Sequence, residues 1–154
     1  MKLRQERGNS IIEFSLLMPW LIFLFVGAMD WGFYAYSLIA TEAAARVACL
    51  YASASATALA DAQSTSSTSS CSYALDQLRK MPNVGTAMST CASGSAVSSV
   101  SPVGVSTTSV TGPDGNPAAQ VSVTYVTPVF VPMAGSGLPK QVTITRTIQM
   151  RMRS

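Results

Sequence analysis

The sequence contains no histidine, and charged residues make up only 11% of its 154 positions. Histidine is the commonest metal ligand and a frequent general base, so its absence lowers the chance of a catalytic or metal centre. Soluble domains carry about 25% charged residues, so this composition argues against an ordinary soluble domain. The net charge of +3 is small and its bases are scattered, which argues against a protein that binds nucleic acid.

The chain also lacks a group of residues suited to catalysis or metal binding. Hydroxyl side chains are plentiful, but none stands in an elbow motif such as G-x-S-x-G. Neither a CxxC spacing nor a histidine is available for a metal site. The acidic residues beyond the N-terminal region lie far apart in sequence: Glu42, Asp61, Asp76 and Asp114. We therefore expect no enzymatic activity, no cofactor and no bound metal.

The apolar residues are concentrated near the N-terminus. No charged residue occurs from Phe14 to Met29, and most side chains in this run are large and apolar. A helix needs about 20 residues to cross the hydrocarbon layer of a membrane, and aromatic rings collect at its interfaces. We therefore predict a transmembrane helix over residues 9–36, because a buried helix would need a larger core than the remaining chain can build. The residues expected at the membrane interface are Asp30, Trp31, Tyr34 and Tyr36.

The charges that flank this run predict its orientation. Lys2, Arg4 and Arg7 precede the run, whereas Arg46 is the only base in the thirty residues that follow Asp30. By the positive-inside rule the N-terminus stays in the cytoplasm and the remainder lies outside. The run ends in an acid and bulky aromatics rather than in the small residues of a signal-peptidase site, so we expect it to remain attached.

The N-terminal junction resembles a prepilin leader. A short basic segment ends at Gly8, and Glu13 follows five residues later at the start of the apolar run. This resemblance implies cleavage between Gly8 and Asn9 by a prepilin peptidase, which leaves Glu13 as the fifth residue of the mature chain. In pilins this acid meets the free N-terminal amine of a neighbouring subunit. The alternative is that Glu13 only reaches the cytoplasmic headgroups.

A wider part of the chain is similar to the TadE-like minor pseudopilins of tight-adherence (Flp, type IVb-like) pilus systems. The resemblance is carried by Gly8, the acid-aromatic pair Glu13-Phe14, Pro19 inside the apolar run, the step Met29-Asp30-Trp31-Gly32, and the Ala-rich segment Glu42–Arg46. Residues 121–152 also look like the closing β-hairpin of that family. Major pilins of these systems are much shorter, which favours a minor subunit.

The resemblance implies a minor pilin or pseudopilin of the bacterial inner membrane that joins or primes a tight-adherence pilus for surface attachment. The implied assembly residues are Glu13, Phe14 and Pro19, although Pro19 either lets the helix melt locally or simply kinks it. The implied partners are other pilin and pseudopilin subunits, the prepilin peptidase, an inner-membrane assembly platform and the lipid bilayer. The alternative is an envelope protein that stays anchored in the membrane and never assembles.

Beyond the membrane the helical pattern continues, and we expect the same helix to extend over residues 37–62. The apolar stripe on this extension is expected to pack against a core; it consists of Ile39, Ala43, Val47, Leu50 and Ala54. Residues 63–154 are expected to form a small α+β domain. Its predicted parts are a short helix at residues 73–81, a turn at residues 112–117 and two alternating strands at residues 121–125 and 142–152.

The predicted fold class is therefore α+β, pilin-like, with a leader at residues 1–8 and a long N-terminal transmembrane and amphipathic helix. A small antiparallel sheet domain packs on the outer half of that helix. Three cysteines outside the membrane indicate an oxidising compartment. Cys71 and Cys91 flank a loop region and are predicted to pair, closing a ring of about twenty residues. Cys49 is expected to pack as a small apolar residue, and its pairing with either of the others is the main alternative.

Overall fold

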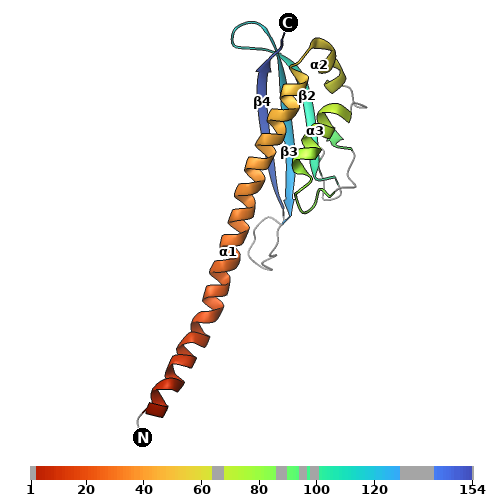
Figure 1. Ribbon diagram of the computed structural model, residues 1–154. Coiled ribbons are helices and arrows are strands. Elements are labelled where there is room, and N and C mark those ends of the chain that lie inside the picture. Colours follow the sequence, from red (N-terminus) through yellow and green to blue (C-terminus); the bar gives the residue numbers. More distant parts are fainter. Residues whose placement is uncertain are drawn as a thin grey trace. The chain divides into compact units, whose positions relative to one another are not determined.

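The computed structural model describes residues 3–63, 68–85, 90–93, 97, 101–128 and 141–153. The chain divides into two compact units, Met1–Tyr34 and Ala35–Ser154. The elements are α1 (Leu3–Ala52), α2 (Ala56–Gln63), α3 (Thr68–Leu78), β1 (Ala92–Ser93), β2 (Val103–Thr111), β3 (Pro117–Pro128) and β4 (Gln141–Arg151) (Figure 1). This is the α+β class that the sequence predicts.

The sheet has the strand order β1-β2-β3-β4. Strands β2, β3 and β4 are antiparallel neighbours, whereas the two-residue β1 runs parallel to β2. The register places Tyr125 of β3 between Val103 of β2 and Ile144 of β4, and all three side chains are buried. The two predicted C-terminal strands are thus confirmed as the pair β3–β4. The segment between them, residues 129–140, lies outside the described residues.

The predicted turn between β2 and β3 is confirmed. The N–H of Gly112 donates to the carbonyl of Asn116 at 2.8 Å, and the N–H of Gly115 donates to the carbonyl of Gly112 at 3.0 Å. Gly115 has a φ of 76°, a left-handed conformation that side chains with a Cβ rarely adopt. The turn therefore depends on glycine at this position.

In the second unit, α1 packs on the sheet through its small residues. The Cys49 thiol lies 3.4 Å from the carbonyl oxygen of Ala119 on β3 and 3.5 Å from that of Ile148 on β4. This part of α1 therefore lies directly over the β3–β4 ladder, as Figure 1 shows. The buried residues recur every three to four positions: Ser37, Thr41, Ala44, Ala45, Ala48, Cys49 and Ala52.

The prediction that the apolar stripe of this helix packs against the core is wrong. Ile39 is 69% exposed and Leu50 is 56% exposed, and Ala54 is exposed as well. The physical reason is distance, because a thiol can contact the carbonyls of the sheet only if the helix backbone comes close to the strands. Small side chains permit that approach, whereas leucine and isoleucine would hold the helix away. The larger apolar side chains of α1 therefore point away from the sheet.

The end of the long helix also differs from the prediction. Helix α1 stops at Ala52 instead of continuing to residue 62, and α2 is a separate helix. The Ser55 hydroxyl accepts the N–H of Ala58 at 3.0 Å, as an N-cap does, so a new helix starts there. The carbonyl of Ser53 accepts the N–H of Arg153 at 3.0 Å, which ties the end of α1 to the residues after β4.

The short predicted helix is present as α3, which begins at Thr68 and ends at Leu78, three residues before the predicted end. Its Leu75 and Leu78 are buried. After α3, Asn83 joins this segment to β3. The Tyr125 hydroxyl donates to Asn83 Oδ1 at 2.5 Å, and Asn83 Nδ2 donates to the carbonyl of Val126 at 2.7 Å. Burial raises the pKa of Tyr125 to about 12, so this hydroxyl remains a donor.

The small-residue face of α1 makes a direct prediction about stability. Ala48→Leu is expected to lower the free energy of unfolding by about 1–3 kcal/mol, because the added carbons must push α1 off the sheet. Leu50→Ala, two residues away on the exposed side, is expected to change it by less than about 0.5 kcal/mol. Urea unfolding of the full-length chain in detergent micelles, followed by near-ultraviolet circular dichroism, measures both. A larger loss in Leu50→Ala than in Ala48→Leu would contradict the observed packing.

Candidate functional site

The first unit consists of α1 up to Tyr34, and its apolar side chains are exposed. From Ile11 to Phe25, large apolar residues lie on all sides of the helix and have between 44% and 76% of their surface accessible. A helix that is apolar all round is normally surrounded by a core or a membrane. The exposed residues are Ile11, Ile12, Phe14, Leu16, Leu17, Met18, Trp20, Leu21, Ile22, Phe23, Leu24 and Phe25.

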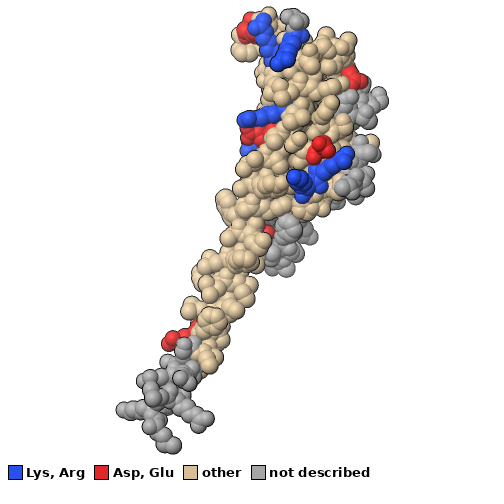
Figure 2. Space-filling view, in the orientation of Figure 1, with Lys and Arg blue, Asp and Glu red and all other residues tan. Residues whose placement is uncertain are grey.

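Among the described residues, one helix is long and apolar enough to cross a membrane. The part from Ile11 to Tyr34 has 24 residues and is about 36 Å long at 1.5 Å per residue. A hydrocarbon layer is about 30 Å thick, so this part is sufficient to span it. In Figure 2 the corresponding surface is tan apart from red carboxylate atoms. The length and composition of α1 therefore fit a membrane anchor.

Glu13 is the acid nearest the start of this apolar surface. Its side chain is exposed on α1, beside the exposed ring of Phe14. No ion pair joins it to any residue whose side chain the structure describes. Gly8 and Asn9, at the predicted cleavage site, lie on α1 as well, but only their backbone is described. The helix thus places the predicted cleavage site just over one turn before the carboxylate.

Pro19 lies inside α1, and the helix continues through it. Because proline has no N–H, the carbonyl of Ser15 lacks its usual partner four residues along the helix. The Ser15 hydroxyl donates to the carbonyl of Ile12 at 2.9 Å. Pro19 therefore removes one backbone hydrogen bond without ending the helix. A role of Pro19 in assembly stays a prediction.

The residues predicted at a membrane interface lie at the other end of the apolar run. Trp31 is 76% exposed, and its ring meets that of Tyr34 edge to face at a centroid distance of 6.4 Å. Asp30 beside them is half-buried, and Tyr36 is exposed. An acid and several amphipathic rings within two turns suit a boundary between lipid and water.

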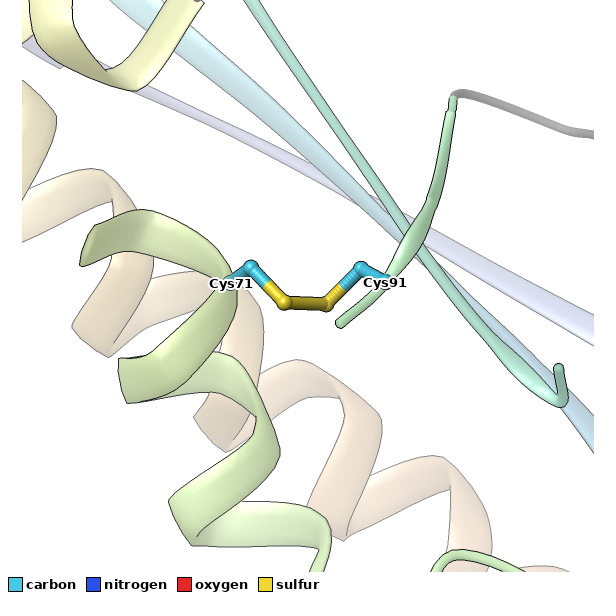
Figure 3. The surroundings of a disulfide bond; sticks show 2 residues. All are labelled: Cys71 and Cys91. Carbon is cyan, nitrogen blue, oxygen red and sulfur yellow. A yellow bond between two sulfur atoms is a disulfide. The ribbon is translucent and has the colours of Figure 1, made fainter. Parts of the chain in front are cut away.

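The predicted disulfide is present. Cys71 on α3 is bonded to Cys91, which directly precedes β1, and their Cα atoms are 5.8 Å apart (Figure 3). Cys49 is free and buried, so the alternative pairings are not those of this structure. Burial raises the pKa of the Cys49 thiol above its usual value. Cys49 is therefore an unreactive thiol in the folded chain.

Sequence reasoning missed two features of the second unit. It did not identify Asn83. The side chain of this residue forms hydrogen bonds with Tyr125 and Val126, which lie 42 and 43 positions further along the chain. It also did not identify the buried small-residue face of α1, although the recurrence from Ser37 to Ala52 was visible in the sequence. Among the described residues, no cluster of three or more cysteine or acidic side chains is arranged to hold a metal ion.

Residues 8–49 match the family model of the TadE-like proteins. The match covers the predicted cleavage site, the apolar run and the Ala-rich part of α1, and it ends before the disulfide and the sheet. No curated protein and no solved structure matches the chain. The family implies a protein associated with tight-adherence pili. The motifs at Gly8, Glu13 and Met29–Gly32 had indicated this resemblance, and residues 8–49 of the chain are accordingly a TadE-like segment.

Proposed function

We propose that this protein is a minor pilin or pseudopilin, a structural subunit that is held in the bacterial inner membrane and then joins or primes a tight-adherence pilus for surface attachment. The observation that carries the proposal is the surface of the first unit. Its large apolar side chains are exposed all round α1, and a single carboxylate interrupts them near their start, within the TadE-like segment.

Such a surface suits a subunit that exchanges one apolar environment for another. In the membrane the side chains from Ile11 to Phe25 would contact lipid, and in a pilus they would contact the helices of neighbouring subunits. Lipid tails and leucine side chains are about equally apolar, so this exchange has little driving force of its own. A polar group is therefore needed to define which neighbour is bound and in which register.

Glu13 supplies that group. A carboxylate within hydrocarbon costs several kcal/mol unless a partner compensates it. Cleavage after Gly8 would create a free amine on Asn9, and the amine of a neighbouring subunit would carry the complementary charge. In the same chain, Asn9 precedes Glu13 by four positions, a rise of about 6 Å along the helix axis. Pairing between subunits therefore links cleavage to assembly.

The charges and cysteines support one orientation. The basic residues before α1's apolar run favour a cytoplasmic N-terminus, and the disulfide favours an oxidising compartment for the second unit. The domain from Ala35 onward would then lie in the periplasm or on the assembled pilus. The partners in this proposal are other pilin and pseudopilin subunits, the prepilin peptidase and the inner-membrane assembly platform.

The second candidate is an envelope protein that remains anchored and never assembles. The exposed apolar helix fits this function equally well, but a permanent anchor has no need for a carboxylate among these side chains. Processing separates the two candidates. A mature N-terminus at Asn9 belongs to the pilin pathway, whereas an intact leader belongs to a permanent anchor.

We expect the chain extracted from cells with an active prepilin peptidase to begin at Asn9 and to contain 146 of its 154 residues. N-terminal sequencing and intact-mass measurement test this. In the matched control, Gly8→Leu, the leader should stay attached, because a bulky side chain replaces the glycine next to the bond to be cut. A wild-type chain that still begins at residue 1 or 2 in such cells would favour the permanent anchor.

A further inference from the structure

Strand β4 forms one edge of the sheet along its whole length. It pairs with β3 from Gln141 to Arg151, and no strand among the described residues pairs with its other side. The opposite edge of the sheet is formed by β1, which has two residues. A long unpaired edge presents a row of free N–H and C=O groups and can accept a further strand.

The register indicates which groups of β4 point outward. The N–H of Met152 donates to the carbonyl of Pro117 at 3.2 Å, so this residue pair is of the hydrogen-bonded kind. Such pairs alternate along an antiparallel ladder, so the even-numbered residues of β4 bond to β3. The N–H of Arg153 accordingly points away from β3, to the carbonyl of Ser53. The residues whose backbone groups face the free edge are Gln141, Thr143, Thr145, Thr147, Gln149 and Arg151.

The two faces of β4 differ in chemistry. The six residues of the free edge all have exposed side chains, and five of them are uncharged and polar. The even-numbered side chains share the packed face of the sheet, where Ile144 is buried and Val142, Ile148 and Met150 are half-buried. Added apolar side chains beside this half-buried row would extend the packed face of the sheet.

Arg146 breaks this apolar row. It lies between Ile144 and Ile148 on the packed face, opposite Val123 of β3, and its side chain is exposed. The ion pairs among the described residues are Arg46–Glu42, Arg79–Asp76 and Arg151–Asp114, and none includes Arg146. The exposed side chain of Arg146, midway along β4, therefore has no ion-pair partner among the described residues.

We propose that β4 accepts an extended segment of another protein as an additional strand, with an acidic residue of that segment opposite Arg146. A second copy of this chain fits less well, because β4 contains two arginines and no acid, so two β4 strands would bring cations together without a counter-charge. The segment would carry alternating apolar residues for the packed face and one acid at its centre. This interaction does not depend on whether the chain enters a pilus.

Arg146 has a second interpretation, in which an inward-pointing charge protects an edge strand from pairing. The two interpretations predict opposite results for Arg146→Ala. A protective arginine leaves an adhesive edge when it is removed, so the variant would self-associate. A selective arginine loses its acidic partner, so the variant would bind that partner more weakly and remain a monomer.

The test uses the full-length chain in detergent micelles and two fluorescent probes. Each probe is an eleven-residue peptide of alternating threonine and valine, with the central valine replaced by glutamate in one and by lysine in the other. Anisotropy should show about tenfold tighter binding of the glutamate peptide, since an opposite-charge pair across strands replaces a like-charge pair. Arg146→Glu should reverse this preference. That reversal is a gain of binding, so misfolding cannot produce it.

A proline variant tests the direction of the backbone groups. Gln149→Pro removes an N–H that faces the free edge, and Gln149 has no side-chain hydrogen bond to lose among those of the described residues. The variant should bind the glutamate peptide at least fivefold more weakly than the wild type does. The midpoint of its unfolding should change little. Met150→Pro removes a bond to β3 and should lower the midpoint. Equal binding of both peptides, no binding of the glutamate peptide, or self-association of Arg146→Ala would each overturn the proposal.

Discussion

Glu13→Ala is expected to be absent from sheared pilus fractions while its amount in the membrane equals that of the wild type. The substitution removes the carboxylate that we propose pairs with the N-terminal amine of a neighbouring subunit. It also makes the apolar run more apolar, so membrane insertion should not decline. The domain from Ala35 onward is a separate compact unit and should keep its disulfide. Immunoblots of membrane and sheared fractions measure both amounts.

Glu13→Asp is the conservative variant for this experiment. It keeps the charge but shortens the side chain, so it should reach the amine less well and give an intermediate amount in pili. Glu13→Gln keeps the shape and loses the charge, and it should behave like alanine. If Glu13→Ala enters pili at the wild-type level, the carboxylate is a passive interfacial residue and the proposed pairing is wrong.

Removal of the disulfide, by Cys71→Ser with Cys91→Ser, is expected to lower the free energy of unfolding by about 3 kcal/mol, because the closed ring of about twenty residues no longer restricts the unfolded chain. The bond joins α3 to the segment that enters β1, and β1 contributes only two residue pairs to the sheet. Urea unfolding of the full-length chain in micelles, with and without reductant, measures the loss. Reductant should have no effect on the double variant.

The same cysteines report on the compartment. In cells that export the second unit, alkylation of unfolded, unreduced protein should modify one thiol, that of Cys49. Three modified thiols would mean that the domain stays in a reducing compartment, contrary to the proposed orientation. Cys49→Ala is the control, since it should leave no modifiable thiol and keep the bond between Cys71 and Cys91.

Much of the second unit could be predicted because its signals are local. The alternation of β3 and β4, the turn at Gly115, and the inward side of α3 each follow from residues within one element. The buried face of α1 could not be found in this way. Hydrophobicity alone predicted that Leu50 would be buried, but the residues buried on this face are small. Small size matters there because the helix approaches the strands closely. Asn83 was missed because both of its partners lie on a distant strand.

For the candidate site, the family could be identified from the sequence, but the roles of its residues depend on partners outside the chain. The family resemblance of the N-terminal segment could be identified from short motifs, and the match over residues 8–49 agrees with it. The role of Glu13 could not be tested in a single chain, because the proposed partner of its carboxylate belongs to another subunit. A side chain that contacts lipid or a neighbour is exposed when the chain stands alone, as Ile11 and Phe25 are. The roles of Glu13, Phe14 and Pro19 thus remain predictions.

The buried thiol of Cys49 has a consequence for biogenesis. Its contacts are the carbonyls of Ala119 on β3 and Ile148 on β4, and both strands follow Cys71 and Cys91 in the sequence. Cys71 and Cys91 are therefore synthesised while Cys49 is still open to oxidation, and a bond from Cys49 to Cys71 would close a ring of similar length. Cys49 is withdrawn from thiol exchange once β3 and β4 have both packed against it. A chain truncated before β4 is therefore expected to accumulate mispaired cysteines.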